Sequence, residues 1–178
     1  MGEKSNLAGI RAIFMDVDGI LTDGKIILGN SIELKSFHVR DGMAIAIARR
    51  CNIKIGFITN RSSDAVKRRA DELKIDFLSQ GTHNKLSCLK EISSTEKISM
   101  NEICYIGDDI IDIPVLKNVG FSATVADAPD EIKRCVHYIS KKNGGCEAVR
   151  DIIQHVLSAQ GKWDRTINDM ISEIENTI

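Results

Sequence analysis

Residues 14–24 read FMDVDGILTDG, and this stretch decides the fold because an apolar segment runs directly into aspartates with glycines among them. Asp16 and Asp18 lie two residues apart, so on an extended backbone their side chains point to the same side. Gly19 then allows the chain to turn away. In an open parallel sheet, ligands bind beyond the carboxyl ends of the strands. The stretch therefore predicts a buried strand that ends in two carboxylates facing one site.

Apolar segments rich in Ile and Val alternate with helix-like segments along the rest of the chain. Continuous apolar runs are typical of strands that are covered on both faces. We expect strands over residues 12–15, 53–58, 75–78, 103–106, 121–125 and 137–139. Helices are expected over residues 41–50, 62–73, 84–92, 109–117 and 147–159. This alternation predicts an α/β fold, a three-layer Rossmann-like parallel sheet with helices on both faces.

Two segments depart from this alternation. Residues 25–28 and 32–37 flank Gly29-Asn30-Ser31, which predicts a β-hairpin inserted after the first strand, over about residues 24–37. The C-terminal tail, about residues 162–178, carries one apolar helical stripe that ends at Ile178 and has no partner left in the sequence. We see no interdomain linker, so residues 1–178 are predicted to form a single domain.

The hairpin and the tail favour a homo-oligomer in which both segments cover a neighbouring subunit's site. The alternative is a hairpin that packs on its own domain and a tail that frays.

Composition argues against two classes of protein. The 178 residues are 43% hydrophobic and 28% charged with a net charge of −1, whereas nucleic-acid binders are usually basic. There is no apolar run near the length of a membrane span, and the first residues, MGEKSNLAGIR, lack the apolar core of a signal peptide. The five cysteines are widely spaced without a CxxC pair, which indicates reduced thiols. We therefore expect a cytoplasmic protein with no nucleic-acid or membrane partner.

Three further polar motifs follow later strands of the predicted sheet. FITNR contains Thr59, QGTHNK ends on Lys85, and YIGDDIID carries Asp108, Asp109 and Asp112. Each motif alone has an ordinary structural explanation: a Thr-Asn turn, a solvated lysine, and an acidic helix cap. Together with the first aspartates they follow four successive strands in order, which favours one shared site at the sheet edge.

The chemistry of these residue types points to a phosphate ester. Asp16, Asp108 and a phosphate dianion place several negative charges in one pocket, which Mg²⁺ and Lys85 would offset. Thr59 offers a hydroxyl to a phosphate oxygen. We expect Asp16 to act as the nucleophile through an aspartyl-phosphate. Asp18 would protonate the leaving alkoxide and then take a proton from water, while its backbone carbonyl joins the metal shell.

These motifs carry a resemblance to a known family. DVDGILTDG, Thr59, Lys85 and GDDIID resemble the motifs of the haloacid dehalogenase superfamily of phosphohydrolases. Its members that act on 3-deoxy-D-manno-octulosonate 8-phosphate are similar over about residues 10–163, through KSFHVRDG, SQGTHNK, YIGDDIIDIPVLKNVG, ATVADAP, GGCEAVRDI and LSAQGKW. The resemblance implies a cap-less, Mg²⁺-dependent homotetramer that frees this sugar acid from its phosphate during lipopolysaccharide precursor synthesis.

The resemblance also implies residue roles. The metal ligands are Asp16, Asp18 and Asp108. Asp109 and Asp112 are expected beside these ligands without binding the ion. The expected substrate contacts are Asp18, His38, Val39, Arg40, Asp41, Gly42, Thr59, Arg61, Arg69 and Lys85.

The chain departs from the family pattern at positions expected to face the sugar. His38 replaces a usual Asn, Asn60 a usual Gly, and Ala46 a usual Arg, while GGCEAVRD stands where GGxGAVRE is usual. These departures leave a nonulosonate 9-phosphate open as an alternative substrate. A non-catalytic phosphate-binding relative is an alternative function.

Overall fold

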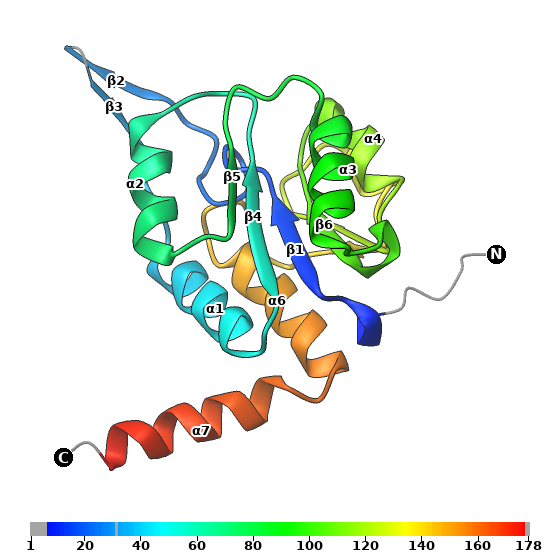
Figure 1. Ribbon diagram of the computed structural model, residues 1–178. Coiled ribbons are helices and arrows are strands. Elements are labelled where there is room, and N and C mark those ends of the chain that lie inside the picture. The colour runs from blue at the N-terminus through cyan, green and yellow to red at the C-terminus, as the bar shows by residue number, and fades with distance from the viewer. Residues whose placement is uncertain (1–6, 31, 177–178) are drawn as a thin grey trace.

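The computed structural model describes residues 7–30 and 32–176, and its centre is a six-stranded sheet (Figure 1). The strand order is β5-β4-β1-β6-β7-β8, and each neighbouring pair is parallel. The strands are β1 (Ala12–Met15), β4 (Lys54–Ile58), β5 (Phe77–Ser79), β6 (Ile103–Ile106), β7 (Phe121–Thr124) and β8 (Tyr138–Ile139). The predicted α/β fold with a parallel sheet is therefore confirmed.

Helices cover both faces of this sheet. On one face α1 packs against α6 and α2, and on the other α3 packs against α4 (Figure 1). The helices are α1 (Val39–Arg50), α2 (Asp64–Leu73), α3 (Lys85–Glu96), α4 (Ile113–Leu116), α5 (Asp130–Lys133), α6 (Ala148–Ala159) and α7 (Trp163–Glu175). Single 3-10 turns are η1 (Leu7–Gly9), η2 (Met100–Glu102) and η3 (Ile110–Asp112). This is the three-layer arrangement that the alternating pattern predicts.

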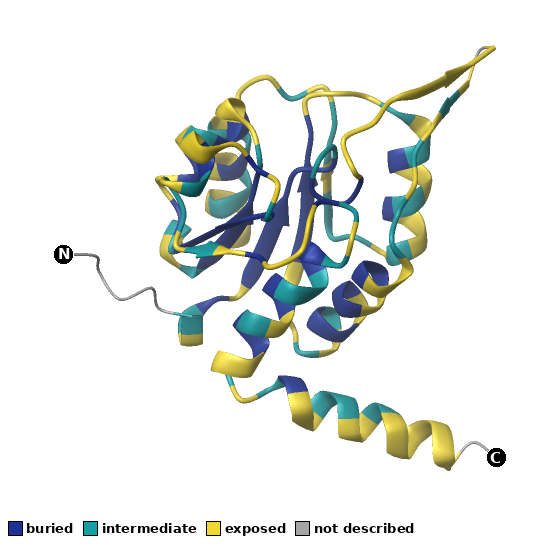
Figure 2. Ribbon diagram, turned by 180° about the vertical axis from the view of Figure 1, so that it is seen from behind, coloured by how far each residue is buried: buried dark blue, intermediate teal, exposed yellow. Residues whose placement is uncertain are grey.

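The central strands are buried on both faces, as their continuous apolar runs predict (Figure 2). Phe14 in β1 shows how tightly they pack. Its ring lies over Gly56 of β4, where an added Cβ would come within 2.3 Å of the ring. The same ring stacks on Phe77 of β5 with centroids 5.6 Å apart. The packing therefore ties together three neighbouring strands below the carboxyl edge of the sheet.

Several helices differ from their predicted bounds, among them α3, which runs to Glu96 instead of ending at residue 92. The helix expected from Asp41 begins at Val39, because His38 caps it by accepting the backbone N–H of Arg40 at 3.3 Å. The helix expected over residues 109–117 is divided into η3 and α4, with Pro114 in the first turn of α4. The short helix α5 is an addition that the sequence pattern did not predict.

The predicted hairpin forms between β1 and α1. Strand β2 (Ile27–Gly29) pairs antiparallel with β3 (Ile32–Leu34), and the pair projects from the body of the molecule (Figure 1). Its apolar side chains face solvent in the single chain, with Leu28 75% exposed. Ser31 of the predicted turn lies outside the described residues.

The C-terminal tail forms α7, which contacts α1 and α6 at the lower side of the view in Figure 1. Trp163 at its start is buried, whereas Ile171 and Ile174 further along are exposed. Ile178, the last residue of the predicted stripe, lies outside the described residues, as do residues 1–6. The exposed part of the stripe is apolar surface that the single chain leaves uncovered.

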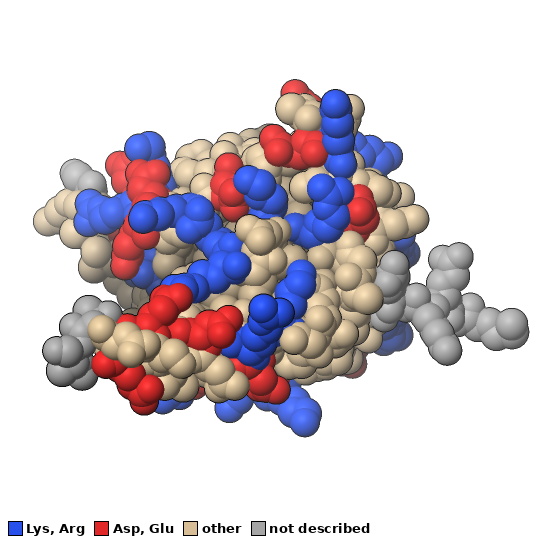
Figure 3. All heavy atoms as spheres, turned by 60° about the horizontal axis from the view of Figure 1, so that its bottom comes forward, with Lys and Arg blue, Asp and Glu red and all other residues tan. Residues whose placement is uncertain are grey.

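The surface carries charges of both signs. On the face shown in Figure 3, Lys and Arg side chains lie among Asp and Glu side chains. Among the residues that the structure describes, no helix combines the length and apolarity that a membrane crossing requires.

Candidate active site

The polar motifs meet where the central strands end. Asp16 follows β1, Thr59 follows β4, and Asp108 comes two residues after β6. Because β4 and β6 flank β1 in parallel, these three positions share one edge of the sheet. Lys85, the first residue of α3, reaches the same edge with its side chain. The structure thus brings together four segments that are distant in sequence.

Lys85 lies at the centre of this group. Its Nζ is 2.7 Å from Oδ2 of Asp16 and 2.7 Å from Oδ1 of Asp112, and its side chain has no exposed surface. Burial alone would lower the pKa of Lys85, but the charges of the two carboxylates outweigh it and raise this pKa above its usual value. The side chain is therefore an ammonium ion that can face a phosphate.

Asp112 is fully buried and holds the Lys85 ammonium through their ion pair. Its Oδ1 also accepts the hydroxyl of Tyr105 at 2.8 Å, and its Oδ2 accepts the backbone N–H groups of Asp108 and Asp109 at 3.2 and 3.3 Å. The carboxylate of Asp109 turns to the exposed N-terminus of η3 and caps it. Of the two aspartates expected beside the metal ligands, Asp112 is thus in the interior and Asp109 is at the surface.

Three carboxylates come close enough to share a cation. Asp16, Asp108 and Asp112 each present an oxygen within 4.8 Å of the others. Oδ1 of Asp108 is buried without a hydrogen-bond partner among the described residues. Burial, with the charges of Asp16 and Asp112, raises the pKa of Asp108 to about 8. Burial also raises the pKa of Asp16 to about 6, against the opposing effect of Lys85. This set of hard oxygen donors with excess negative charge fits Mg²⁺.

Gly19 makes room for the Asp108 carboxylate. A Cβ on Gly19 would stand 2.0 Å from Oδ2 of Asp108, and the backbone of Gly19 has φ +86°. Thr22 fixes this turn by accepting the N–H groups of Gly19 and Gly24 at 3.3 and 3.2 Å. The glycine after the two aspartates therefore allows both the turn and the close approach of the Asp108 carboxylate from the loop after β6.

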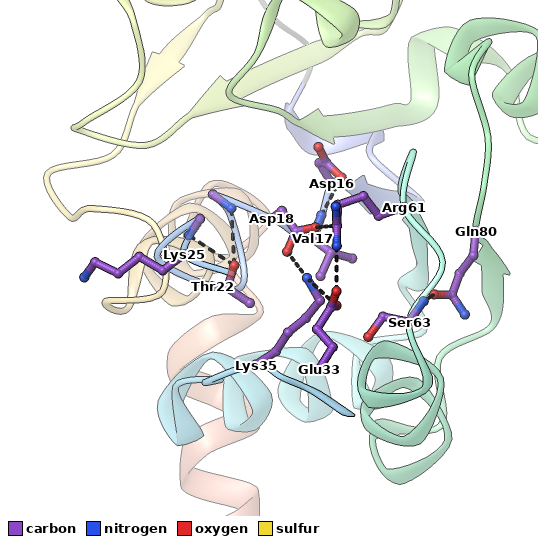
Figure 4. Close-up of polar contacts among 12 residues, drawn as sticks. Asp16, Val17, Asp18, Thr22, Lys25, Glu33, Lys35, Arg61, Ser63 and Gln80 are labelled. Carbon is purple, nitrogen blue, oxygen red and sulfur yellow. Dashed lines mark hydrogen bonds and ion pairs between the residues drawn. The ribbon is translucent and has the colours of Figure 1, made fainter. Parts of the chain in front are cut away.

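Asp18 stands apart from the carboxylate cluster. Its Oδ1 forms an ion pair with Lys35 Nζ, and its Oδ2 lies 3.7 Å from Arg61 Nε (Figure 4). The side chain is 21% exposed, so it can reach a ligand in solution. Its carboxylate is thus separate from the three oxygens that could hold a cation, as proton transfer by Asp18 requires.

The predicted phosphate contacts divide into two groups. Thr59 is buried, and its backbone is held by Ser79 and Thr82 at 2.9 and 3.1 Å. Arg61 is partly exposed beside Asp18. Arg69 lies elsewhere, over the ring of Phe37, in a cleft of about 780 Å³ between β3 and α2. Within one chain, Thr59 and Arg61 therefore approach the site, whereas Arg69 belongs to the neighbouring cleft.

The predicted sugar-binding stretch is only partly accessible. Val39 and Arg40 are exposed, and His38 is half-buried. Asp41 is fully buried, and its Oδ1 accepts the backbone N–H of Arg150 at 2.8 Å. Gly42 packs so closely on Arg69 that an added Cβ would lie 2.5 Å from its Nη2. In the single chain, these last two residues of the stretch face the protein interior.

Sequence reasoning missed two residues that contact the site, Glu33 and Lys35. They stand two positions apart at the end of the hairpin, which places both side chains on one side of an extended segment. The signal in the sequence was this pair of opposite charges, two positions apart in a mostly apolar hairpin, which could have indicated a polar contact with the site.

Comparisons with known proteins agree with this geometry. Residues 71–153 match the family model of haloacid dehalogenase-like hydrolases. The 3-deoxy-D-manno-octulosonate 8-phosphate phosphatase of Escherichia coli K12 is 41% identical over 156 residues, which cover 87% of this chain and 83% of the relative. The chain belongs to the haloacid dehalogenase-like hydrolases, in the family of these octulosonate phosphatases.

Solved structures of octulosonate phosphatases have the same fold. The enzyme from Yersinia pestis superposes with a TM-score of 0.87 and 40% identity, covering 89% of this chain and 86% of that chain. A structure from Moraxella catarrhalis, in complex with magnesium, phosphate and a KDO molecule, has a TM-score of 0.90 and 36% identity. That match covers 92% of this chain and 95% of the Moraxella chain. Among the described residues, the segment between β1 and α1 forms a two-stranded hairpin, in agreement with the cap-less fold that the sequence predicts.

Proposed function

We propose that this protein hydrolyses 3-deoxy-D-manno-octulosonate 8-phosphate to the free sugar acid and inorganic phosphate, a step in lipopolysaccharide precursor synthesis. The observation that carries the proposal is the buried Lys85 ammonium between Asp16 and Asp112, next to the unpartnered Oδ1 of Asp108. This arrangement supports the binding of a phosphate together with a cation. The identity of the substrate rests on the octulosonate phosphatase relatives.

Asp16 acts as the nucleophile in this reaction. A carboxylate oxygen of Asp16 forms a bond to phosphorus while the bond from phosphorus to the ester oxygen breaks, which leaves an aspartyl-phosphate. Asp18 donates its proton to the departing alkoxide. Water then attacks phosphorus, Asp18 takes a proton from it, and Asp16 leaves as a carboxylate. Lys85 offsets the negative charge of the phosphoryl group in both steps.

The carboxylates of Asp16 and Asp108, with the backbone carbonyl of Asp18, would hold Mg²⁺. When bound, the ion neutralises charge on the phosphoryl oxygens. Thr59 and Arg61 are assigned to the phosphate, and His38, Val39 and Arg40 to the sugar acid. Since Asp41, Gly42 and Arg69 do not face the site within one chain, a direct role for them in binding would depend on a neighbouring subunit or on a rearrangement.

The enzyme is proposed to act as a homotetramer in the cytoplasm. The exposed apolar side chains of the hairpin and of α7 support assembly, because both surfaces are left uncovered in one chain. The five cysteines are free, which supports a reducing compartment. Sedimentation equilibrium of the purified protein tests the assembly, and a monomer at micromolar concentration would count against it.

A nonulosonate 9-phosphate is the second candidate substrate. The observation in its favour is local: His38 and Glu147, two departures from the family pattern, lie 4.0 Å apart beside Arg40. His38 belongs to the predicted sugar-binding stretch and Glu147 contacts it, so both can alter which sugar acid fits. A non-catalytic role is disfavoured, because the chain retains the nucleophile, the acid/base, the lysine and the metal ligand.

Phosphate release from a panel of phosphorylated sugar acids tests the proposal. The eight-carbon and nine-carbon esters are compared at equal concentration, with Mg²⁺ and with a chelator. We expect faster release from the eight-carbon ester and loss of activity with the chelator. Faster release from the nine-carbon ester would reverse the choice of substrate, and full activity in the chelator would contradict the metal requirement.

A further inference from the structure

Four charged side chains form a closed network around Asp18, which we name the Asp18 network: Asp18, Glu33, Lys35 and Arg61. Lys35 Nζ forms ion pairs with Oδ1 of Asp18 and, at 3.3 Å, with Oε1 of Glu33. Arg61 donates from Nη2 to Oε2 of Glu33 at 2.6 Å, and its Nε lies 3.7 Å from Oδ2 of Asp18. Figure 4 shows the four side chains pointing toward one another from three separate segments.

The burial of Lys35 sets this network apart from ordinary surface ion pairs. The Lys35 side chain has no exposed surface, although the hairpin that carries it projects into solvent. A lysine ammonium removed from water is costly unless it is paired, and here two carboxylates pair it. By contrast, Lys25 at the other end of the hairpin pairs with Asp23 while 79% exposed. An apolar or exposed side chain at position 35 would avoid this desolvation cost, so a buried lysine at this position calls for a role beyond stability.

The network links the hairpin to the proposed acid/base. Lys35 follows β3 directly, Arg61 lies in the loop after β4, and Asp18 is in the loop after β1. Asp18 has no ion pair with Lys85 among the described residues, and its two oxygens contact only the cations of this network. The position of the Asp18 carboxylate therefore depends on where the base of the hairpin lies.

We infer that Lys35 is a positioning residue for Asp18, and that Glu33 holds Lys35 and Arg61 in place. This inference rests on the proposed function. Lys35 engages Oδ1 and Arg61 lies beside Oδ2, so the two cations fix the orientation of the Asp18 carboxyl group toward the leaving alkoxide. Loss of the Lys35 ammonium leaves Asp18 present but free to rotate. Cleavage of esters whose leaving group needs a proton then suffers most.

A single-turnover experiment with enzyme in excess separates this role from a general structural one. The sugar-acid phosphate has an alkoxide leaving group that needs a proton, whereas p-nitrophenyl phosphate releases a stable phenolate without one. In Lys35→Met we expect cleavage of the sugar ester to slow by about 100-fold, in the range of lost general acid catalysis. Cleavage of the aryl ester should change by less than about 3-fold, because the nucleophile and Lys85 are untouched.

Three variants complete the test. Lys35→Arg keeps a cation and should recover most of the rate on the sugar ester, and Glu33→Gln should give a smaller loss with the same dependence on leaving group. Lys25→Met removes the exposed lysine of the hairpin and should leave both rates unchanged. Glu33→Gln retains the Lys35 ammonium and weakens only its support, so it gives an answer even if Lys35→Met fails to fold.

The outcomes distinguish the inference from the proposed function. If the wild type cleaves both esters and the Lys35 and Glu33 variants lose both rates equally, or lose neither, the positioning role is overturned and the proposed function stands. If the wild type with Mg²⁺ cleaves neither ester, the proposed function fails and the positioning role fails with it.

Discussion

Nζ of Lys85 lies 2.7 Å from an oxygen of Asp16 and 2.7 Å from an oxygen of Asp112, in a pocket where the lysine side chain is wholly buried. The ion pairs connect the end of β1 to the segment after β6 through the start of α3. Since a buried ion is stable only when it is paired, these contacts stabilise the fold and the site together.

Lys85→Met should impair both stability and activity. Removing the ammonium leaves two buried carboxylates without their partner, so we expect the free energy of unfolding to fall by about 3 kcal/mol. Phosphatase activity should fall by more than about 1,000-fold, because the phosphoryl charge is no longer offset. Urea unfolding and phosphate release measure the two effects. Lys90→Met, an exposed lysine on the same helix, is the matched control, and equal stability of the two variants would contradict this account.

Gly19→Ala should displace Asp108 and weaken metal binding. The added Cβ would overlap the Asp108 carboxylate, and the left-handed backbone adds strain of about 1 kcal/mol. We expect the dissociation constant for Mg²⁺, measured by calorimetry, to rise by about 10-fold or more. Gly161→Ala is the matched control, because Gly161 has a similar φ of +66° with no atom within 4 Å of the added Cβ. Gly161→Ala should carry the same backbone strain but keep the Mg²⁺ affinity of the wild type. Equal Mg²⁺ affinity in Gly19→Ala and Gly161→Ala would argue against Asp108 as a ligand.

Magnesium affinity should rise with pH. Burial and neighbouring carboxylates raise the pKa of Asp108 to about 8, so at pH 7 Mg²⁺ must displace a proton from it. Below pH 8 we expect the affinity to fall by up to about tenfold for each pH unit. Calorimetric titrations in two buffers of different ionisation enthalpy measure the protons released, and zero release at pH 7 would contradict this prediction.

The stability of the metal-free protein should change with pH in the opposite direction. The pKa values of Asp16 and Asp108 rise from 3.8 to about 6 and about 8 on folding, so the folded state holds these protons more tightly than the unfolded state. Their contribution to stability is complete below about pH 4 and is lost as pH rises to about 8. In chelator, the melting temperature should decrease as pH rises from 5 to 8. Added Mg²⁺ should raise the melting temperature again at pH 8. Asp108→Asn should flatten the fall, and an unchanged pH dependence in that variant would contradict the assignment.

Glu147 combines an unfavourable backbone conformation with a favourable side-chain ion pair, and two substitutions should separate these effects. Its φ is +74°, a region that favours glycine, and its carboxylate pairs with Arg40 Nη1 at 2.7 Å. Glu147→Ala loses the pair and keeps the strain, whereas Glu147→Gly loses both. We therefore expect the glycine variant to be more stable by about 1 kcal/mol in chemical unfolding. Both variants should raise KM for the sugar ester without a matching loss of kcat, and an unchanged KM would separate Glu147 from substrate binding.

The sequence pattern predicts the sheet well and the contacts between segments poorly. The bounds of β1 and β6 agree with prediction because each is a continuous apolar run flanked by polar residues. The start of α1 was wrong because His38 is an unusual N-cap residue, and the short α5 has too few residues for a helical period. Strand order follows from right-handed connections, so the meeting of Asp16, Lys85 and Asp108 was predictable.

The partners of individual side chains at the site were harder to predict. Alternation indicates that Glu33 and Lys35 share a side, but not that they reach Asp18. Asp41 has a polar side chain in a stretch expected to bind substrate, yet it is buried because α6 brings the backbone N–H of Arg150 to it. Lys35 and Asp18 are 17 residues apart and Asp41 and Arg150 are 109 apart, and no local pattern in the chain encodes either contact.

Acid-quench mass spectrometry tests most directly whether Asp16 is the nucleophile. The enzyme is mixed with Mg²⁺ and 3-deoxy-D-manno-octulosonate 8-phosphate, quenched in acid within the first turnover, and digested to locate any phosphoryl group. We predict a phosphoryl group on the peptide that contains Asp16, and neither this adduct nor phosphate release in Asp16→Asn. Turnover by Asp16→Asn, or a phosphoryl group on a different residue, would contradict the account.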